Sequence, residues 1–473
     1  MPSSIQQVQP PLEFIPPKLS LPVVRSFQTL LPLVMRLQTN IRQVEAHNLE
    51  QLVDLLKQFQ EGKIRLMLAF RHPTTVDPLA LAYLLTRLVP KTAKALGVKL
   101  NQPLHSHFMY DRGIPLWAGS YTEWVFSHLG GTPIQRGKVD RAGLRSARAL
   151  FVDGHYPLTA APEGATNGHN EIVSPLEPGV SQLAFWCVED LLKAGRSEKV
   201  LILPIGMRYT YIDPPWPAIA ALLTDLELDT GLIAAPDINN HSLDETTLYQ
   251  RLFRLGEHLL STMEDFYTRF YHQVLPAPSD LIRGGNPNAA FSARLNTLLD
   301  VALKVAEDYF DLNSKGSVID RCRRLEQAAW DQIYRDDLNL NHLSPMERGL
   351  ADRVAEEADL RIWHMRLVES FVAVTGNYVQ QKPSAERFAE TSLLIWDTVA
   401  QIKGASPAGR PRLGTQRAVI TVGEPISISD RWPDYSSGRR NAKQAITDLT
   451  ADLQTAMEIM AVDQTVSTCY NLS

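Results

Sequence analysis

A histidine and an aspartate five residues apart could carry out proton-transfer chemistry. His72 and Asp77 bound the segment His72-Pro-Thr-Thr-Val-Asp77. A carboxylate bonded to one imidazole nitrogen fixes the tautomer and stabilises the imidazolium, so the other nitrogen can take a proton from a hydroxyl. A capping aspartate beside a surface histidine has the same spacing, so the pair is a weak signal by itself.

Three further segments carry residues suited to a substrate site. A glycine pair ending at Gly131 allows close backbone approach, and Arg136 follows with a guanidinium that suits a phosphate. Glu163-Gly164 follows a proline, so the carboxylate stands on a stiff loop and could hold a hydroxyl or a cation. Pro204 interrupts an apolar run. Because proline removes a ladder hydrogen bond, we expect a strand edge or end there, beside a pocket.

In order and spacing, these segments resemble the four motifs of the glycerolipid acyltransferase family, which includes lysophosphatidic acid and glycerol-3-phosphate acyltransferases. The matching positions are His72 and Asp77, then Gly131 and Arg136, then Glu163 and Gly164, and lastly Pro204. The resemblance covers roughly residues 60–235 and 415–460. It implies an α/β fold with a mixed sheet covered by helices, of the glycerolphosphate acyltransferase-like kind.

The resemblance also implies an activity and roles for these residues. The expected reaction moves a fatty acyl group from acyl-CoA or acyl-carrier protein to a glycerol-phosphate or lysophospholipid hydroxyl. His72 would be the base and Asp77 would orient it. The expected substrate-binding residues are Arg136, Glu163, Gly164, Gly131 and Pro204. The acyl donor is a co-substrate, and neither a cofactor nor a metal is expected.

The third motif departs from the family pattern. Where the family has Thr-Arg, this chain has Ala165-Thr166, so one phosphate-binding arginine is missing. The candidates to replace it are Arg71, Lys138 and Arg141. Two alternatives therefore stay open: an acyltransferase for a non-phosphorylated acceptor, or a degenerate domain that serves as a partner-binding scaffold.

The surrounding periodicity predicts the elements that would position these residues. Residues 64–70, 200–205 and 418–422 are short apolar runs typical of buried strands, and 79–99, 140–152 and 179–195 are expected to be helices. Strands that alternate with helices favour an α/β layer structure. An apolar tunnel is needed for the acyl chain, and Trp216–Leu223 is a candidate wall.

The same pattern predicts a domain organisation. We expect a flexible proline-rich tail over 1–22, an N-terminal amphipathic helix over 23–60, and an acyltransferase domain over 61–239 and 415–460. Residues 240–414 are expected to be a helical insertion and 461–473 a C-terminal tail. Leu30, Val34 and Leu37 are expected on the core-facing side of the first helix, although the helix could instead lie on a membrane.

Composition narrows the function classes. The 473 residues carry a net charge of −5, which disfavours a nucleic-acid partner. The three cysteines are far apart, and neither a signal peptide nor a membrane span is evident, so we expect a cytoplasmic protein with peripheral membrane contact. Arg141, Arg145 and Arg148 share one helix face, which is either a solvated face or a docking patch for an anionic partner.

Overall fold

The computed structural model separates the chain into two compact units, which are described individually. It describes residues 5–135, 140–233, 243–276, 286–371, 377–405, 409–462 and 469–471. The sheet unit comprises Phe14–Gln135, Asp140–Ile212 and Thr415–Ser473. The helical unit comprises Asp213–Gly414 and the described residues 5–13.

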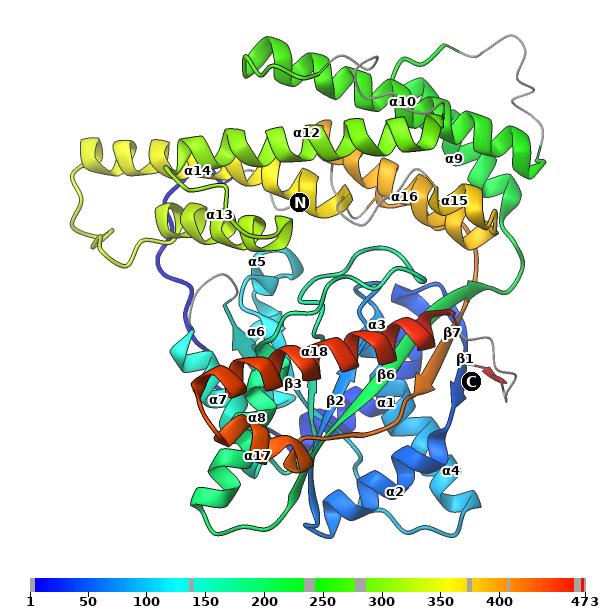
Figure 1. The fold of residues 1–473 in the computed structure, drawn as a ribbon, viewed down its shortest axis with the longest axis vertical. Helices are drawn as coiled ribbons and strands as arrows, with labels where there is room; N and C mark the ends of the chain where they lie inside the picture. Colours follow the sequence, from blue (N-terminus) through cyan, green and yellow to red (C-terminus); the bar gives the residue numbers. More distant parts are fainter. Residues whose placement is uncertain are drawn as a thin grey trace. The chain divides into compact units, whose positions relative to one another are not determined.

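The described strands of the sheet unit form one mixed sheet of nine strands (Figure 1). Its order is β4-β3-β5-β2-β6-β7-β1-β9, with β8 paired to β6. Strands from β4 to β6 run parallel, whereas β7 runs antiparallel to β6. The prediction of an α/β fold with a mixed sheet is confirmed. The strands are β1 Ile41–His47, β2 Ile64–Phe70, β3 His107–Asp111, β4 Gly131–Ile134, β5 Leu158–Ala160, β6 Lys199–Tyr211, β7 Gln416–Val422, β8 Ile426–Ser427 and β9 Cys469–Asn471.

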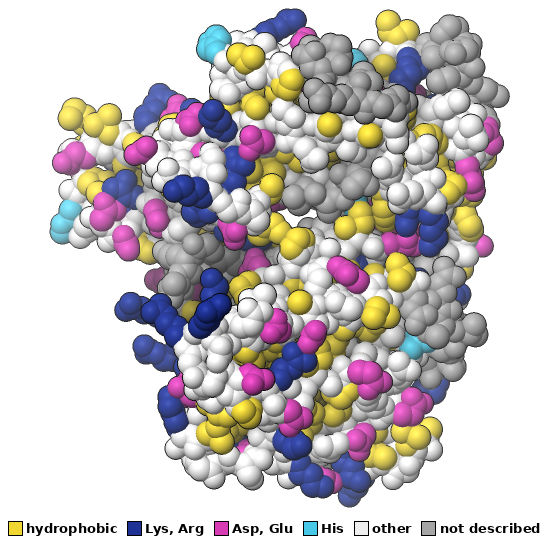
Figure 2. Space-filling model, viewed as in Figure 1, with side chains coloured by type: hydrophobic (Ala, Val, Ile, Leu, Met, Phe, Trp, Pro, Cys, Tyr) yellow, Lys and Arg dark blue, Asp and Glu magenta, His cyan; other side chains and the backbone are white. Residues whose placement is uncertain are grey.

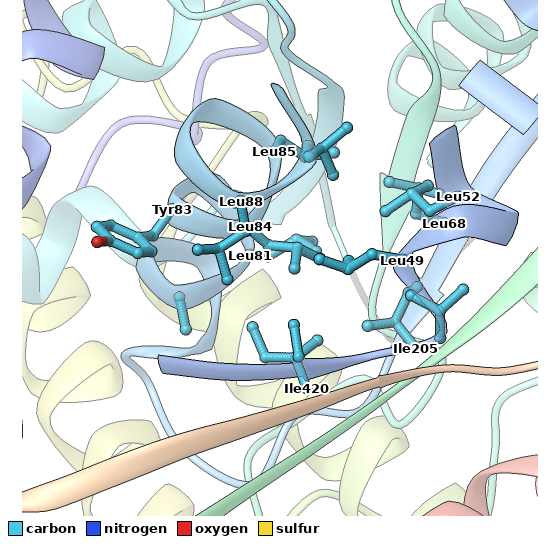
Figure 3. Close-up of a cluster of buried hydrophobic side chains, with 14 of the residues drawn as sticks. Leu49, Leu52, Leu68, Leu81, Tyr83, Leu84, Leu85, Leu88, Ile205 and Ile420 are labelled. Atoms are coloured by element: carbon cyan, nitrogen blue, oxygen red, sulfur yellow. The ribbon is translucent and has the colours of Figure 1, made fainter. Parts of the chain in front are cut away.

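Side-chain alternation along the central strands builds a separate core on each face of the sheet. On β2, Leu66 and Leu68 point into one core, whereas Met67 and Ala69 point into the other. Figure 3 shows Leu68 with Ile205 and helical leucines in the first core. That face is covered by α1 Leu21–Gln38, α2 Leu49–Gln60, α3 Asp77–Tyr83, a π-helical turn Leu84–Leu88 and α4 Val89–Ala95. The other face is covered by α7 Arg141–Asp153, α8 Gly179–Lys193, α17 Trp432–Ser436 and α18 Arg439–Val462.

The N-terminal amphipathic helix expected over 23–60 is wrong in its extent. The segment is α1, then strand β1, then α2. Leu37, Ile41 and Val44 have the spacing of one helix face, although α1 ends at Gln38 and β1 begins at Ile41. Two buried residues of a strand that lie three positions apart have the same spacing as two residues on one side of a helix. The core face of α1 is Val24, Leu31 and Met35. The expected core residues Leu30 and Leu37 are instead exposed.

The chain ends also differ from the prediction where they are described. Instead of a flexible tail, the backbone N–H of Ile5 donates to Asp359 and that of Val8 to Asp352, within the helical unit. Further on, Lys18 donates to the carbonyl of Ser127 in the sheet unit. The expected C-terminal tail contains β9, which pairs with β1. Backbone pairing of this kind depends on distant partners, which local composition does not reveal.

The helical unit is built from long helices joined by loops. Its elements are α9 Trp216–Asp229, α10 Glu245–Phe270, α12 Pro287–Tyr309, α13 Val318–Ile333, α14 Pro345–Phe371, α15 Tyr378–Gln381 and α16 Ala385–Ile402. At the start of α14 the Ser344 hydroxyl accepts from the backbone N–H of Glu347, and the Glu347 carboxylate accepts from the backbone N–H of Ser344, which forms a capping box. Helix α9 was expected in the α/β domain, but it belongs to this unit. None of the described helices has the length and apolar character needed to cross a membrane.

Candidate active site

The His72–Asp77 pair forms at the carboxyl end of a central parallel strand. Strand β2 ends at Phe70, and α3 begins at Asp77, so the intervening turn brings the two side chains together. The distance from His72 Nδ1 to Asp77 Oδ2 is 2.9 Å. An ionised carboxylate can only accept, so the neutral imidazole that this contact favours has its proton on Nδ1 and its lone pair on Nε2. The backbone N–H of Thr74 also donates to Asp77 Oδ2 at 2.9 Å, which orients the carboxylate.

Tyr209 completes the surroundings of Asp77. The Asp77 side chain is fully buried, and burial raises its pKa, against the opposing effects of His72, Tyr209 and Thr74. The Tyr209 hydroxyl donates to Asp77 Oδ1. Burial, together with the Asp77 charge, raises the pKa of Tyr209 well above its usual value, so the phenol stays protonated and remains a donor. Three donors therefore hold a carboxylate that burial alone would tend to protonate.

His72 remains partly open to solvent, unlike its partner. Its side chain is 20% exposed, and its ring packs edge-on against Phe70 with centroids 5.5 Å apart. Within the described parts of the chain, Nε2 has no hydrogen-bond partner. A fixed imidazole whose free nitrogen points away from its carboxylate is the arrangement that general-base catalysis requires.

Glu163 lies beneath His72 and supports the backbone. The Glu163 Oε1 atom accepts a bond of 2.7 Å from the backbone N–H of His72, and Oε2 accepts one of 3.0 Å from Ser174. The side chain is fully buried and ion-paired with Arg71, at 3.6 Å between Nε and Oε1. Both carboxylate oxygens are thus bonded within the protein, and the expected role of Glu163 in holding an acceptor hydroxyl stays a prediction. Its carboxylate is enclosed, and it positions the loop that carries the histidine.

Arg71 is likewise unavailable to a substrate phosphate. Its guanidinium is fully buried and donates to the backbone carbonyls of His169, Asn170 and Ile172. These contacts fasten the loop after β5 onto the end of β2. As a replacement for the missing phosphate-binding arginine, Arg71 is therefore ruled out in this conformation. The planar fork of an arginine suits such a cluster of acceptors.

The glycines of the motifs have packing roles. Gly164 has φ +71°, and a Cβ there would come 2.3 Å from a Glu177 carboxylate oxygen. At Gly131 a Cβ would come 2.5 Å from the Phe108 ring. Gly131 begins β4, and both β3 and β5 lie between that strand and β2. No described contact of either glycine supports the expected substrate-binding role.

Pro204 lies inside a central strand, so the expectation of a strand edge or end is wrong. It pairs with Ala69 of β2, and its carbonyl accepts from Gly423. The Pro204 nitrogen, which has no hydrogen to donate, lies on the side of β6 that faces β7 and β8. At this position β7 has ended at Val422 and β8 has not yet begun at Ile426. No ladder bond is lost there, because the partner strand itself is interrupted.

The expected basic residues have different outcomes. Arg136 and Lys138 lie outside the described residues. Arg148 pairs with Asp190 and Glu189 of α8, so it does not belong to a free basic face. Arg141 and Arg145 are exposed. Figure 2 shows Lys and Arg side chains gathered at the left edge of the sheet unit, where Figure 1 labels α7.

Tyr209 and Asn170 are the site residues that sequence reasoning missed. Strand β6 continues past the end of β2, and there the Asn170 side chain bonds both the N–H and the carbonyl of Tyr209. Tyr209 shares the period-two face of Ile205 and Met207. The alternation of side chains along β6 could have shown which face of the sheet Tyr209 occupies. It could not have shown that Asp77 lies within hydrogen-bond distance of the Tyr209 hydroxyl.

Comparison of the whole chain with protein-family models, with curated proteins and with solved structures finds no match. The assignment of function therefore depends on the geometry of the site and on the order of the motifs.

Proposed function

We propose that this protein is an O-acyltransferase that moves a fatty acyl group from a thioester donor, acyl-CoA or acyl-carrier protein, to a hydroxyl. The observation that carries the proposal is His72, whose Nδ1 is bound to buried Asp77 while Nε2 has no partner in the described chain. This arrangement supports the proposal, because such an imidazole can accept a proton at Nε2 while the carboxylate stabilises the resulting imidazolium.

In the proposed reaction, His72 Nε2 takes the proton of the acceptor hydroxyl as its oxygen attacks the thioester carbonyl carbon. The tetrahedral intermediate then collapses, the carbon–sulfur bond breaks, and the thiolate receives the proton from Nε2. Asp77 keeps its negative charge throughout and stabilises the imidazolium. Tyr209 and Thr74 hold that charge in place.

We extend the proposal to a glycerolphosphate acyltransferase-like fold. In support, the first and third motifs follow β2 and β5, which are adjacent and parallel. The carboxyl ends of neighbouring parallel strands share one sheet edge, where ligands of open α/β sheets bind. The hydrogen bond from the His72 backbone to Glu163 joins the two motifs directly.

The acceptor we propose is a glycerol-phosphate or lysophospholipid, with Arg136 as the expected phosphate-binding residue. A non-phosphorylated acceptor is a second candidate, and the burial of Arg71 favours it. With that arginine committed to backbone carbonyls, a dianionic phosphate would have fewer cations to bind it.

We also propose peripheral contact with a lipid surface through α1. Leu30 and Leu33 on its outer side are 53% and 54% exposed, and Arg25 and Arg36 are exposed on the same helix. A helix with leucines on a solvent-facing side and arginines nearby suits the boundary of an anionic bilayer.

A thioester-consumption assay on the purified protein tests the proposed activity. The acceptors are glycerol-3-phosphate, lysophosphatidic acid, other lysolipids and plain alcohols, each with acyl-CoA and with acyl-carrier protein. We expect His72→Ala to lower turnover by a factor on the order of 10²–10⁴. His155→Ala, at an exposed histidine, is the matched control and should remain active.

The result separates the candidates. Activity with phosphorylated acceptors that is lost in His72→Ala supports the proposal, and activity with uncharged acceptors alone supports the second candidate. If the folded protein consumes no thioester with any acceptor, a partner-binding scaffold is favoured. Near-normal turnover by folded His72→Ala would overturn the proposed role of His72 as the base.

A further inference from the structure

The helical unit contains an apolar cavity that the proposed chemistry does not use. It lies among α10, α12, α14 and α16, with α15 beside them, and its volume is about 110 Å³. Leu252, Leu260, Leu295 and Ile395 are among the side chains that line it. All its described lining residues belong to the helical unit. The expected tunnel wall Trp216–Leu223 contributes none of them.

The walls offer almost nothing that a polar ligand could recognise. None of the described residues that line the cavity is charged. The Tyr249 hydroxyl donates to Asn288 at 2.9 Å, and the Thr398 hydroxyl donates to the carbonyl of Leu394 at 3.0 Å. Thr391 is the third hydroxyl residue among the described lining residues. Since two of the three hydroxyls are already bonded within the protein and the rest of the lining is apolar, the cavity would select its ligand mainly by shape and apolar contact.

The dimensions of the cavity favour a thin ligand. Lining residues on α10 run from Tyr249 to Met263, about 21 Å along the helix axis at 1.5 Å per residue. An apolar cavity of about 150 Å³ binds benzene, so by that scale this one has room for only four or five carbons. The lining is long but the volume is small, so the cavity would hold the end of a thin ligand rather than the whole of a large one. It suits a flexible chain better than a compact ring system, and it excludes a protein helix about 10 Å wide.

We propose that this cavity binds an unbranched hydrocarbon chain, such as that of a fatty acid or an acyl lipid. Ile402 lines the cavity and is 45% exposed, so the proposed route of entry for the chain lies beside it. The site stands on the geometry of the helical unit alone, so it does not depend on the chemistry proposed for His72.

Gly256 allows the cavity to be filled without removing any contact. It lines the cavity from α10, and an added Cβ would meet the Phe291 ring at 3.4 Å, an ordinary contact distance. Gly256→Leu adds four carbons, enough to occupy the space available. Gly349 on α14 is exposed with open space around it, so Gly349→Leu makes the same change of residue in a helix outside the cavity.

The experiment measures binding of cis-parinaric acid, a fatty acid that fluoresces in apolar sites, to the full-length protein. We expect a saturable rise in emission that straight-chain saturated fatty acids reverse. Each methylene buried by the competitor should improve displacement about fourfold, until the cavity is full. Gly256→Leu should weaken binding by a factor on the order of 100, because the added side chain occupies the space of about four methylenes of the bound fatty acid. Gly349→Leu and His72→Ala should bind as the unmodified protein does.

Three results would overturn the proposal. They are no saturable binding by the folded protein, equal affinity in folded Gly256→Leu, or displacement by compact aromatic compounds with no dependence on chain length. If Gly256→Leu does not fold, as judged by circular dichroism, Leu259→Trp replaces it. Leu259 also lines the cavity but is half-buried, so it leaves room for a larger side chain.

Discussion

Removal of the Tyr209 hydroxyl tests how the site stabilises the buried negative charge of Asp77. It donates to Asp77 Oδ1, and Tyr209→Phe removes that donor alone, because Asn170 binds the Tyr209 backbone. The Asp77 carboxylate would then keep the donors His72 and Thr74. Burial already raises the pKa of Asp77, and loss of a donor to its charged form must raise that pKa further.

The expected magnitude follows from the kind of bond that is lost. A hydrogen bond to a charged group contributes about 1.5–3 kcal/mol, and one pKa unit corresponds to about 1.4 kcal/mol. We therefore expect Tyr209→Phe to raise the pKa of Asp77, at a cost of about 1.5–3 kcal/mol to its ionised form. The proposed activity needs ionised Asp77, so the acid limb of the pH–rate profile should move to higher pH.

Stability gives a readout that does not depend on the substrate. Because burial raises the folded pKa of Asp77 above its unfolded value, its contribution to stability is greatest below the unfolded pKa and is lost as pH rises through the folded pKa. In Tyr209→Phe the folded pKa of Asp77 is higher than in the unmodified protein, so the variant should lose more of its free energy of unfolding as the pH rises. Urea unfolding should show a deficit of about 1.5–3 kcal/mol at pH 8 and a smaller one near pH 4.5.

Tyr156→Phe is the matched control for this substitution. Tyr156 is also a buried tyrosine of the sheet unit, and its hydroxyl has no hydrogen-bond partner among the described residues. Loss of that hydroxyl should leave stability unchanged or raise it slightly, with no shift in the pH–rate profile. A Tyr209→Phe deficit that is the same at both pH values, with an unshifted acid limb, would refute the role assigned to the phenol.

Three further variants test other parts of the structure. Arg71→Met should lower the free energy of unfolding by about 3–5 kcal/mol, because it leaves a buried carboxylate without its cation. A loss below about 1 kcal/mol in urea would contradict that. Asp77→Asn should reduce turnover by a factor on the order of 10⁴ through the wrong imidazole tautomer, yet keep or raise the melting temperature, because a buried charge is removed. Leu30→Ser with Leu33→Ser should weaken cosedimentation with anionic vesicles at an unchanged melting temperature, whereas Leu31→Ser in the core should destabilise the fold. Unchanged vesicle binding by the double variant would remove α1 from the membrane proposal.

Short-range features of the site were predictable because they depend on neighbours in the chain. Strand β2 occupies the predicted residues 64–70, since an apolar run of that length can only be buried. His72 and Asp77 meet across one tight turn between β2 and α3. The capping box at Ser344 is equally local.

Other predictions failed where a local pattern had two readings. The spacing that continued a helix through Ile41 and Val44 also fits a strand with two buried positions, and only pairing with β7 decided between them. Pro204 was expected at an edge because a missing N–H is costly inside a sheet. The gap between β7 and β8 removes that cost, and a gap in a partner strand cannot be read from the strand itself.

The sequence by itself determined the α/β alternation, the central buried strands and the contact of His72 with Asp77, because each depends on residues only a few positions apart. The tertiary structure alone decided that Glu163, in the loop after β5, and Tyr209, on β6, reach this pair across 91 and 132 residues. It also decided which side of α1 is buried, and it assembled the described lining of the cavity from five separate helices. The physical reason is that sheet order and helix packing bring together side chains whose sequence separation carries no signal of their contact.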